Sequence, residues 1–285
     1  MTSYLYPYLQ ESVSLNENSK DNYILTIQYS LDGLSFVVFD NNEQKFLCLK
    51  HYNITDKEVS LNSLLIELQA KENWKINDFK KVNFLIDNNK NTFIPKEYFQ
   101  EENKETFLEL LARDKVNYVR ADELISVNSV NVYSLNEDVT TLLSQFGERI
   151  NVCHVSTILA ETLVKEFSER NSEIRTFVNV KNNTFELTII DGSRLIFHNY
   201  FSFSTKEDFL YFILFTFEQL KIDNETVPLY FMGIIEKKSP IVELCSRYVR
   251  NIRFFNRNNN LNYCKELDSI PYFYYYILYS SILCE

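Results

Sequence analysis

The hydrophobic and polar positions of this chain follow the same order twice. From Tyr23 to Asp87, an apolar run is followed by a tight turn, two more apolar runs, an amphipathic segment and a further apolar run, and Arg175 to Met232 repeats that order. Short apolar runs between turn residues predict strands, whereas apolar residues spaced by three and four positions predict helices. The pattern therefore predicts two related α/β halves, with the boundary between Arg170 and Arg175.

The first half opens with three predicted antiparallel strands, at 23–29, 34–40 and 45–52. The dipeptide Asp32-Gly33 between the first two predicts a hairpin, because both positions tolerate a positive φ. Asp56 is the expected N-cap of a helix that ends near Trp74, and a buried strand is expected at 82–87. The remaining predicted elements are helices at 104–113, 136–146 and 157–170, the last capped by Ser156, an edge or irregular strand within 116–134, and a strand at 150–155.

The second half repeats three strands, at 174–180, 184–191 and 194–201. They are followed by a helix from Thr205 to Leu220, a strand from Pro228, a helix at 239–250, a strand at 251–255 and an aromatic helix at 271–283. His51 and His198 each end the third strand of their half, which supports the correspondence. We predict an N-terminal arm at 1–22, a first domain at 23–172 and a second domain at 173–285. The aromatic helix is expected to pack on the crevice side of the first half or to bind a partner.

Composition narrows the class of protein. Hydrophobic residues make up 45% of the chain, which predicts a globular fold. The net charge of -10 is spread over interspersed acidic and basic residues, which argues against a nucleic-acid surface. The five cysteines are scattered without the CxxC spacing of zinc sites, and no apolar run approaches the length of a membrane span. We therefore expect a cytoplasmic protein that neither binds nucleic acid nor inserts into a membrane.

Three antiparallel strands followed by alternating helix and strand, twice over, resemble the actin-like ATPase superfamily, whose halves have a ribonuclease H-like fold. More narrowly, FVVFD with IPKEYF and then FELTIIDGSRLIFHNYF is similar to a family of uncharacterised proteins from Bacteroidota bacteria, domain of unknown function 3822, that is grouped with actin-like folds. The resemblance covers roughly Tyr23 to Leu283. It implies a duplicated α/β fold in which each half has the element order β-β-β-α-β-α-β-α, a mixed sheet with flanking helices.

The resemblance also implies where a ligand would bind. In the superfamily, one glycine-containing hairpin turn from each half holds the phosphates of ATP, and an Asp orients the magnesium ion with its waters. The corresponding residues here, which form the predicted cofactor site in the crevice, are Asp32 and Gly33 in the first turn, Asn183 and Thr184 in the second, and Gly233 on the adenosine side. The second turn, 181–184, has no glycine, and the whole chain has only four. We therefore expect side chains to fill the crevice where phosphates would lie.

Three functional hypotheses follow. The leading one is a non-catalytic actin-like interaction or scaffold protein, with degenerate phosphate-binding loops, an unknown protein partner, and no cofactor, metal or catalytic residue. The alternative is an ATP- and magnesium-binding ATPase or kinase-like enzyme that uses Asp32 and Thr184. The second alternative is a metal-dependent nuclease of the ribonuclease H-like fold, with the strand-end residues Asp40, Asp87 and Asp191 around the metal. Cys153 and His154 are adjacent on a predicted strand, so their side chains face opposite ways and cannot form a nucleophile–base pair.

Overall fold

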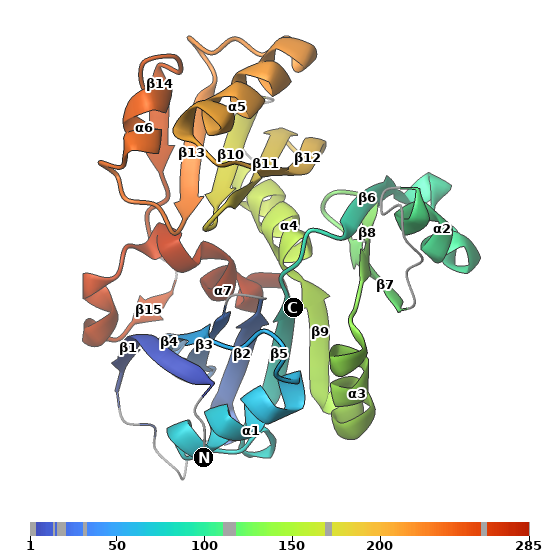
Figure 1. Ribbon diagram of the computed structural model, residues 1–285, viewed down its shortest axis with the longest axis vertical. Coiled ribbons are helices and arrows are strands. Elements are labelled where there is room, and N and C mark those ends of the chain that lie inside the picture. The colour runs from blue at the N-terminus through green and yellow to red at the C-terminus, as the bar shows by residue number, and fades with distance from the viewer. Residues whose placement is uncertain are drawn as a thin grey trace.

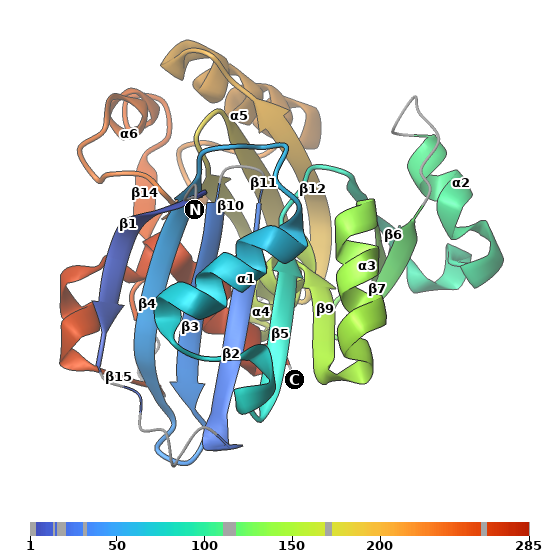
Figure 2. The same cartoon turned by 60° about the horizontal axis from the view of Figure 1, so that its bottom comes forward.

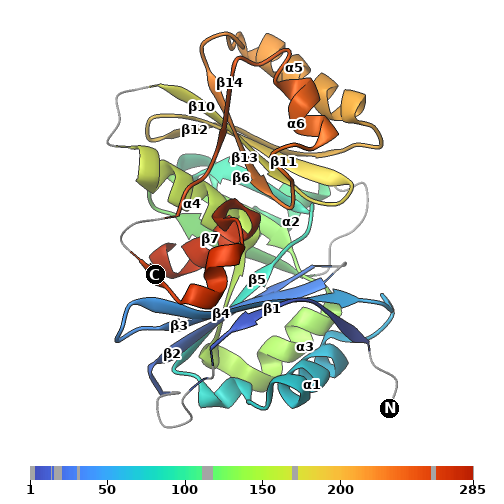
Figure 3. The same ribbon diagram turned by 90° about the vertical axis from the view of Figure 1, so that its left-hand side faces the viewer.

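The computed structural model describes residues 4–13, 15, 21–30, 33–110, 118–168, 173–257 and 261–284. Seen from the side, the chain forms five layers: helices, a sheet, a pair of helices, a second sheet and further helices (Figure 3). A small separate sheet projects from one side (Figure 1). This layering is that of an α/β protein, as the sequence predicts. Among the described residues, no helix is both long and apolar enough to cross a membrane.

The first sheet has the strand order β1-β4-β3-β2-β5-β9. Its strands are β1 (Leu5–Ser12), β2 (Tyr23–Tyr29), β3 (Gly33–Asp40), β4 (Lys45–Ile54), β5 (Lys81–Ile86) and β9 (Ile150–His154), and the short β15 (Asn262–Tyr263) also pairs with β4. Strands β2, β3 and β4 are antiparallel, whereas β5 and β9 run parallel to β2. Helices α1 (Leu61–Glu72) and α3 (Glu137–Phe146) cover its outer face (Figure 2).

The second sheet has the order β12-β11-β10-β13-β14. Its strands are β10 (Ile174–Val180), β11 (Thr184–Asp191), β12 (Arg194–Ser202), β13 (Pro228–Gly233) and β14 (Asn251–Phe254). Order and direction match β4-β3-β2-β5-β9 strand for strand. Helices α5 (Lys206–Leu220) and α6 (Pro240–Cys245) cover the outer face (Figure 3). The repeated element order of the sequence thus appears as two sheets of one topology.

The small sheet is inserted between β5 and β9. It consists of β6 (Asn91–Pro95), β8 (Ser129–Ser134) and β7 (Val119–Leu124) in that order, and helix α2 (Lys104–Glu109) accompanies it. The prediction of a single strand within 116–134 was wrong, because Asn128 takes a positive φ of 51° and closes a tight turn between β7 and β8. The predicted arm at 1–22 likewise contains the edge strand β1, which pairs with β4.

Two helices begin at other residues than the pattern predicts. The N-cap of α1 is Ser60, whose Oγ accepts from the Ser63 amide at 3.3 Å, while Asp56 closes a separate turn. Helix α4 (Val155–Phe167) is capped by His154, whose Nδ1 accepts from the Ser156 amide at 3.1 Å. The Ser156 hydroxyl, which does not cap the helix, points out of it toward the second sheet. The Ser156 side chain is therefore part of the candidate site between the sheets.

Helix α4 and the C-terminal segment fill the space between the sheets (Figure 3). The prediction of one aromatic helix at 271–283 was wrong. The C-terminal segment consists of the 3-10 turns Lys265–Ser269 and Tyr272–Tyr275, the short α7 (Tyr276–Ser280) and a last 3-10 turn, Ser281–Cys284. Its rings pack on the inner face of the first sheet, with Tyr279 against Phe46 at 4.8 Å between ring centroids. The expected packing on the crevice side of the first half is therefore confirmed.

Candidate functional site

The four described residues of the predicted cofactor site belong to three loops at the facing ends of the two sheets. Gly33 begins β3, and its amide donates to Ser30 Oγ at 3.2 Å. Asn183 is exposed in the turn after β10, and Thr184 begins β11. Gly233 ends β13 opposite Val180, so the second and third loops are neighbours. Asp32 lies outside the described residues.

Gly233 occupies a position that only glycine can take. Its φ is +85°, and a Cβ atom built there would lie 2.1 Å from the Val180 carbonyl oxygen. The Ile234 amide next to it donates to the same oxygen at 2.9 Å. The absence of a side chain at Gly233 therefore lets the end of β13 approach the end of β10 closely enough for this hydrogen bond. Its requirement is explained by the fold without a ligand.

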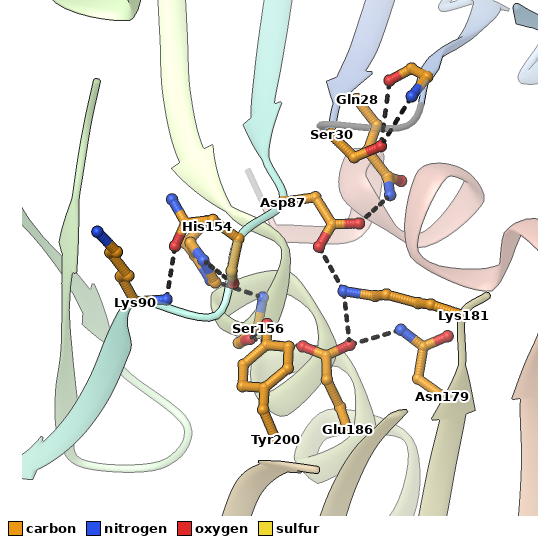
Figure 4. A network of polar contacts seen from close by, with 12 residues as sticks. Gln28, Ser30, Asp87, Lys90, His154, Ser156, Asn179, Lys181, Glu186 and Tyr200 are labelled. Atoms are coloured by element: carbon orange, nitrogen blue, oxygen red, sulfur yellow. Dashed lines mark hydrogen bonds and ion pairs between the residues drawn. The ribbon is translucent and has the colours of Figure 1, made fainter. Parts of the chain in front are cut away.

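Lys181, in the turn between β10 and β11, joins the two sheets (Figure 4). Its ammonium group forms an ion pair with Asp87, which follows β5 of the first sheet. The other carboxylate oxygen of Asp87 accepts from Gln28 Nε2 at 2.9 Å, and Gln28 lies on β2, next to the first turn. The side chain of Asp87 is only 5% exposed. One buried carboxylate thus links β2 of the first sheet to the turn between β10 and β11.

Glu186, on β11, lies on the other side of the lysine. Its Oε2 is 3.6 Å from Lys181 Nζ and accepts from Asn179 Nδ2 at 2.5 Å, and its Oε1 accepts from Ser156 Oγ at 2.8 Å. The Tyr200 hydroxyl is 2.8 Å from the same Ser156 Oγ (Figure 4). Glu186 is fully buried and comes from the middle of an apolar strand. A charged residue in such a strand is the one sequence signal that could have identified this site.

The ionisation of this cluster follows from burial and from the single cation. Burial raises the pKa of Asp87. Burial opposes ionisation of Glu186 most strongly, but the Lys181 ammonium, His198 and the hydrogen bonds from Tyr200 and Asn179 together outweigh it and lower the pKa of Glu186 to about 2. The same two carboxylates outweigh burial at Lys181 and raise the pKa of its ammonium. The three groups together are therefore neutral or anionic, whether Asp87 holds its proton or not.

The nearby histidines add no positive charge. Burial lowers the pKa of His154 to about 3 and that of His198 to about 4. The neutral form of His154 satisfies both ring nitrogens, because Nδ1 accepts from the Ser156 amide and Nε2 donates to the Asn88 carbonyl at 3.2 Å. At neutral pH the crevice thus offers a phosphate no unpaired cation among these side chains.

A second buried carboxylate anchors the small sheet to α4. Oδ2 of Asp122, on β7, accepts from the His154 amide at 2.8 Å, from Thr157 Oγ1 at 2.8 Å and from Cys153 Sγ at 3.1 Å. Its Oδ1 accepts from the Tyr133 hydroxyl at 2.9 Å. Burial raises the pKa of Asp122. Cys153 and His154 point to different partners, as their adjacency on a strand predicts.

The strand-end aspartates of the nuclease hypothesis do not converge. Asp40 pairs with Tyr23 at the start of β2, whereas Asp87 follows the opposite end of that sheet. Asp191 pairs with Ile174 at the start of β10, far along the strand from the turn that holds Lys181. In the parts of the chain that the structure describes, no group of three or more His, Cys, Asp or Glu side chains could hold a metal ion.

Two sheets that share a five-strand topology, with helices packed between them, define the actin-like ATPase fold. The chain matches the family described as "Protein of unknown function (DUF3822)" over residues 12–252, and it belongs to that family. No functionally curated protein matches it in sequence.

Solved structures agree with this fold. One is a protein of actin-like ATPase fold and unknown function from Bacteroides thetaiotaomicron VPI-5482, with 19% identity and a TM-score of 0.78 over 96% of this chain and 100% of that one. Another is the PilM-PilN type IV pilus biogenesis complex, with 11% identity and a TM-score of 0.60 over 90% of this chain and 96% of that one. The identities are low, so these likenesses establish the fold alone.

Proposed function

We propose that this protein is a non-catalytic actin-like interaction or scaffold module of the cytoplasm, with a degenerate nucleotide site. The observation that carries the proposal is Lys181. In an actin-like ATPase the two facing hairpin turns hold phosphates, whereas here the lysine of the second turn is neutralised by Asp87 and Glu186. A protein-internal ion pair takes the place of the bound anion.

Electrostatics supports this proposal. A triphosphate in the crevice would meet a cluster of one cation and two carboxylates and so would gain no net attraction from Lys181. Each uncompensated negative charge 4 Å from the phosphates would cost about 4 kcal/mol at an effective dielectric constant of 20. Neither carboxylate is available to hold a magnesium ion with the phosphates, because both are already bound to Lys181, Gln28 or Asn179. The glycine-poor second turn adds exposed Asn182 and Asn183 side chains at its tip.

The PilM-PilN complex supports the interaction role, because it contains a protein of this fold bound to another protein. The fold is thus compatible with work as a binding module. The partner of the present chain is a separate question, and affinity capture with the wild-type chain in its native host addresses it.

Isothermal titration with Mg-ATP tests the proposal. We expect no binding heat at millimolar nucleotide for the wild-type chain. Micromolar binding would overturn the proposal and favour the alternative, an ATP- and magnesium-binding enzyme in which Thr184 and the first turn contact the ligand. A Lys181→Met variant is the companion measurement, because a phosphate contact by Lys181 would make any observed affinity fall in that variant.

A further inference from the structure

The ion pair in the crevice holds an amine and two carboxyl groups together, largely away from water. Nζ of Lys181 contacts Oδ1 of Asp87 directly and lies 3.6 Å from Oε2 of Glu186 (Figure 4). The side chains of Asp87 and Glu186 are 5% and 0% exposed, and Lys181 is the most exposed of the three at 25%. The ring of Tyr200 lies 5.1 Å from Nζ. An amine and a carboxyl in contact, with little water around them, have the arrangement from which an amide bond forms.

The surrounding hydrogen bonds give each carboxyl group a different part in such a reaction. Gln28 Nε2 donates to Oδ2 of Asp87 at 2.9 Å, whereas the lysine contacts Oδ1. This donor stabilises the negative charge that develops on Oδ2 when an amine attacks Cγ. Asn179 Nδ2 donates to Oε2 of Glu186 at 2.5 Å, and Ser156 Oγ donates to Oε1 at 2.8 Å. Glu186 is thus held with Oε2 toward the ammonium, where it can take up a proton.

Burial favours the neutral carboxyl group that an amine attacks. It raises the pKa of Asp87, and transfer of a proton from Lys181 to Asp87 converts two charges in a water-poor site into two neutral groups. Burial acts in the same direction at Lys181, but the two carboxylates outweigh it and raise the pKa of the ammonium. The neutral amine is therefore scarce, so we expect a slow reaction that depends on Glu186 as the base.

We propose that Lys181 and Asp87 condense to an intramolecular amide bond in the folded protein, with Glu186 as general base. Glu186 accepts a proton from Nζ, the neutral amine attacks Cγ of Asp87, and the bond between Cγ and Oδ1 breaks. Oδ1 leaves as water with that proton and a second one from Nζ, which regenerates Glu186. One ammonium and one carboxylate thus give one amide and one water molecule, and the reaction consumes no oxidant or cofactor.

The amide bond joins the segment after β5 of the first sheet to the turn between β10 and β11 of the second. Unlike a disulfide, it persists under reducing conditions. Before it forms, the cluster has the ionised contacts described above. The cross-link does not rest on the proposed function, because it is detected as a change of mass, whereas the proposed function is tested by nucleotide binding.

Mass spectrometry of the full chain, denatured after incubation in the folded state, tests the cross-link. We expect a wild-type mass below that of the sequence by one water molecule, and a tryptic peptide in which residues 82–90 are joined to 176–194 without cleavage after Lys181. Lys181→Arg keeps the cation but has no amine nucleophile, so it should keep the full mass of its sequence. Glu186→Gln keeps both reacting groups and should slow the appearance of the joined peptide by ~100-fold or more. The matched control is Lys206→Arg, at a surface ion pair, which should cross-link like the wild type.

Two outcomes would overturn the cross-link. One is a folded wild-type chain that keeps the full mass of its sequence after prolonged incubation, which would leave the cluster as an ion pair only. The other is a loss of water without the joined peptide, or one that persists in Lys181→Arg, which would indicate cyclisation at an Asp-Gly step, 32–33 or 191–192. A joined peptide that forms equally fast in Glu186→Gln would overturn the role given to Glu186. Circular dichroism shows whether each variant is folded, and the wild-type peptide map decides the question even where a variant is not.

Discussion

Lys181, in a turn of the second sheet, forms an ion pair with Asp87, at the end of a strand of the first sheet. The two residues are 94 positions apart in the chain. Asp87 is nearly inaccessible to water, and Lys181 also faces the fully buried Glu186 at 3.6 Å. The contact therefore ties the end of a strand of the first sheet to a turn of the second.

Lys181→Met should lower the free energy of unfolding by about 3 kcal/mol, because it leaves two buried carboxylates without their cation. We take the lower end of the range for broken buried pairs, since the lysine side chain is 25% exposed. Urea titration followed by circular dichroism measures this loss. Lys206→Met is the matched control: its pair with Glu207 is on the surface, and its loss should cost under about 1 kcal/mol. Equal losses in the two variants would contradict the role given to Lys181.

Because burial lowers the pKa of His154, we expect the folded protein to lose stability in mild acid. Its ordinary pKa of 6.5 is lowered by burial to about 3 in the folded protein. The unfolded chain therefore takes up the proton first, so stability that is present above pH 6.5 is lost as the pH falls toward 3. Linkage gives about 2 kcal/mol lost by pH 5 for this one group. Unfolding free energies at pH 7 and pH 5 should differ less in His154→Gln than in wild type, and the same pH dependence in both would refute the assignment.

Local patterns predicted most of the two large sheets correctly. The three antiparallel strands of each half are apolar runs bounded by turn residues. The expected correspondence of His51 with His198 was wrong in detail: His51 pairs with Ser35, five residues before Asp40, whereas His198 pairs with Thr188, three residues before Asp191. His51 Nδ1 lies 2.6 Å from Ser35 Oγ, and His198 Nδ1 lies 2.9 Å from Thr188 Oγ1. Strand β1 escaped prediction because an edge strand buries little: only Leu5 of its eight residues is fully buried, so the segment has no continuous apolar run.

The sequence could predict which loops come near one another, but not which side chains meet there. The three loops that supply Gly33, Thr184 and Gly233 do lie at the facing ends of the sheets, because topology alone puts them there. The ion-pair cluster depends on which side chains meet across the sheets, and neither Asp87 nor Lys181 has a local pattern that names its partner. Glu186, a carboxylate within an apolar strand, offered a signal that the sequence prediction missed.

Asp122→Asn should loosen the small sheet from α4. The neutral amide keeps one acceptor where the carboxylate accepts from four donors, and it turns an N–H group toward donors such as Thr157. We expect a loss of about 2 kcal/mol, typical of hydrogen bonds to a charged group. Hydrogen exchange should speed up first in 119–134. Asp56→Asn is the control, because Asp56 closes an exposed turn, and uniform exchange in both variants would argue against an anchoring role.

Gly147 and Gly233 both have a positive φ, but only Gly233 is crowded by neighbouring atoms. Replacing each by alanine therefore measures backbone strain and crowding separately. Gly147, with φ +57° and ψ −137°, has nothing within 4 Å of an added Cβ, so Gly147→Ala should cost only about 1–3 kcal/mol, for a backbone conformation that favours glycine. Gly233, with φ +85°, adds a Cβ position 2.1 Å from the Val180 carbonyl oxygen and 2.7 Å from Asn179 Oδ1. Gly233→Ala must therefore displace the end of β10 next to Lys181 and disturb the hydrogen bond between Asn179 and Glu186. We expect it to lower the free energy of unfolding by more than ~4 kcal/mol. Thermal unfolding of the two variants measures the difference. Similar melting temperatures would mean that the second sheet yields at this point, and that the crevice is less rigid than the contacts of Gly233 imply.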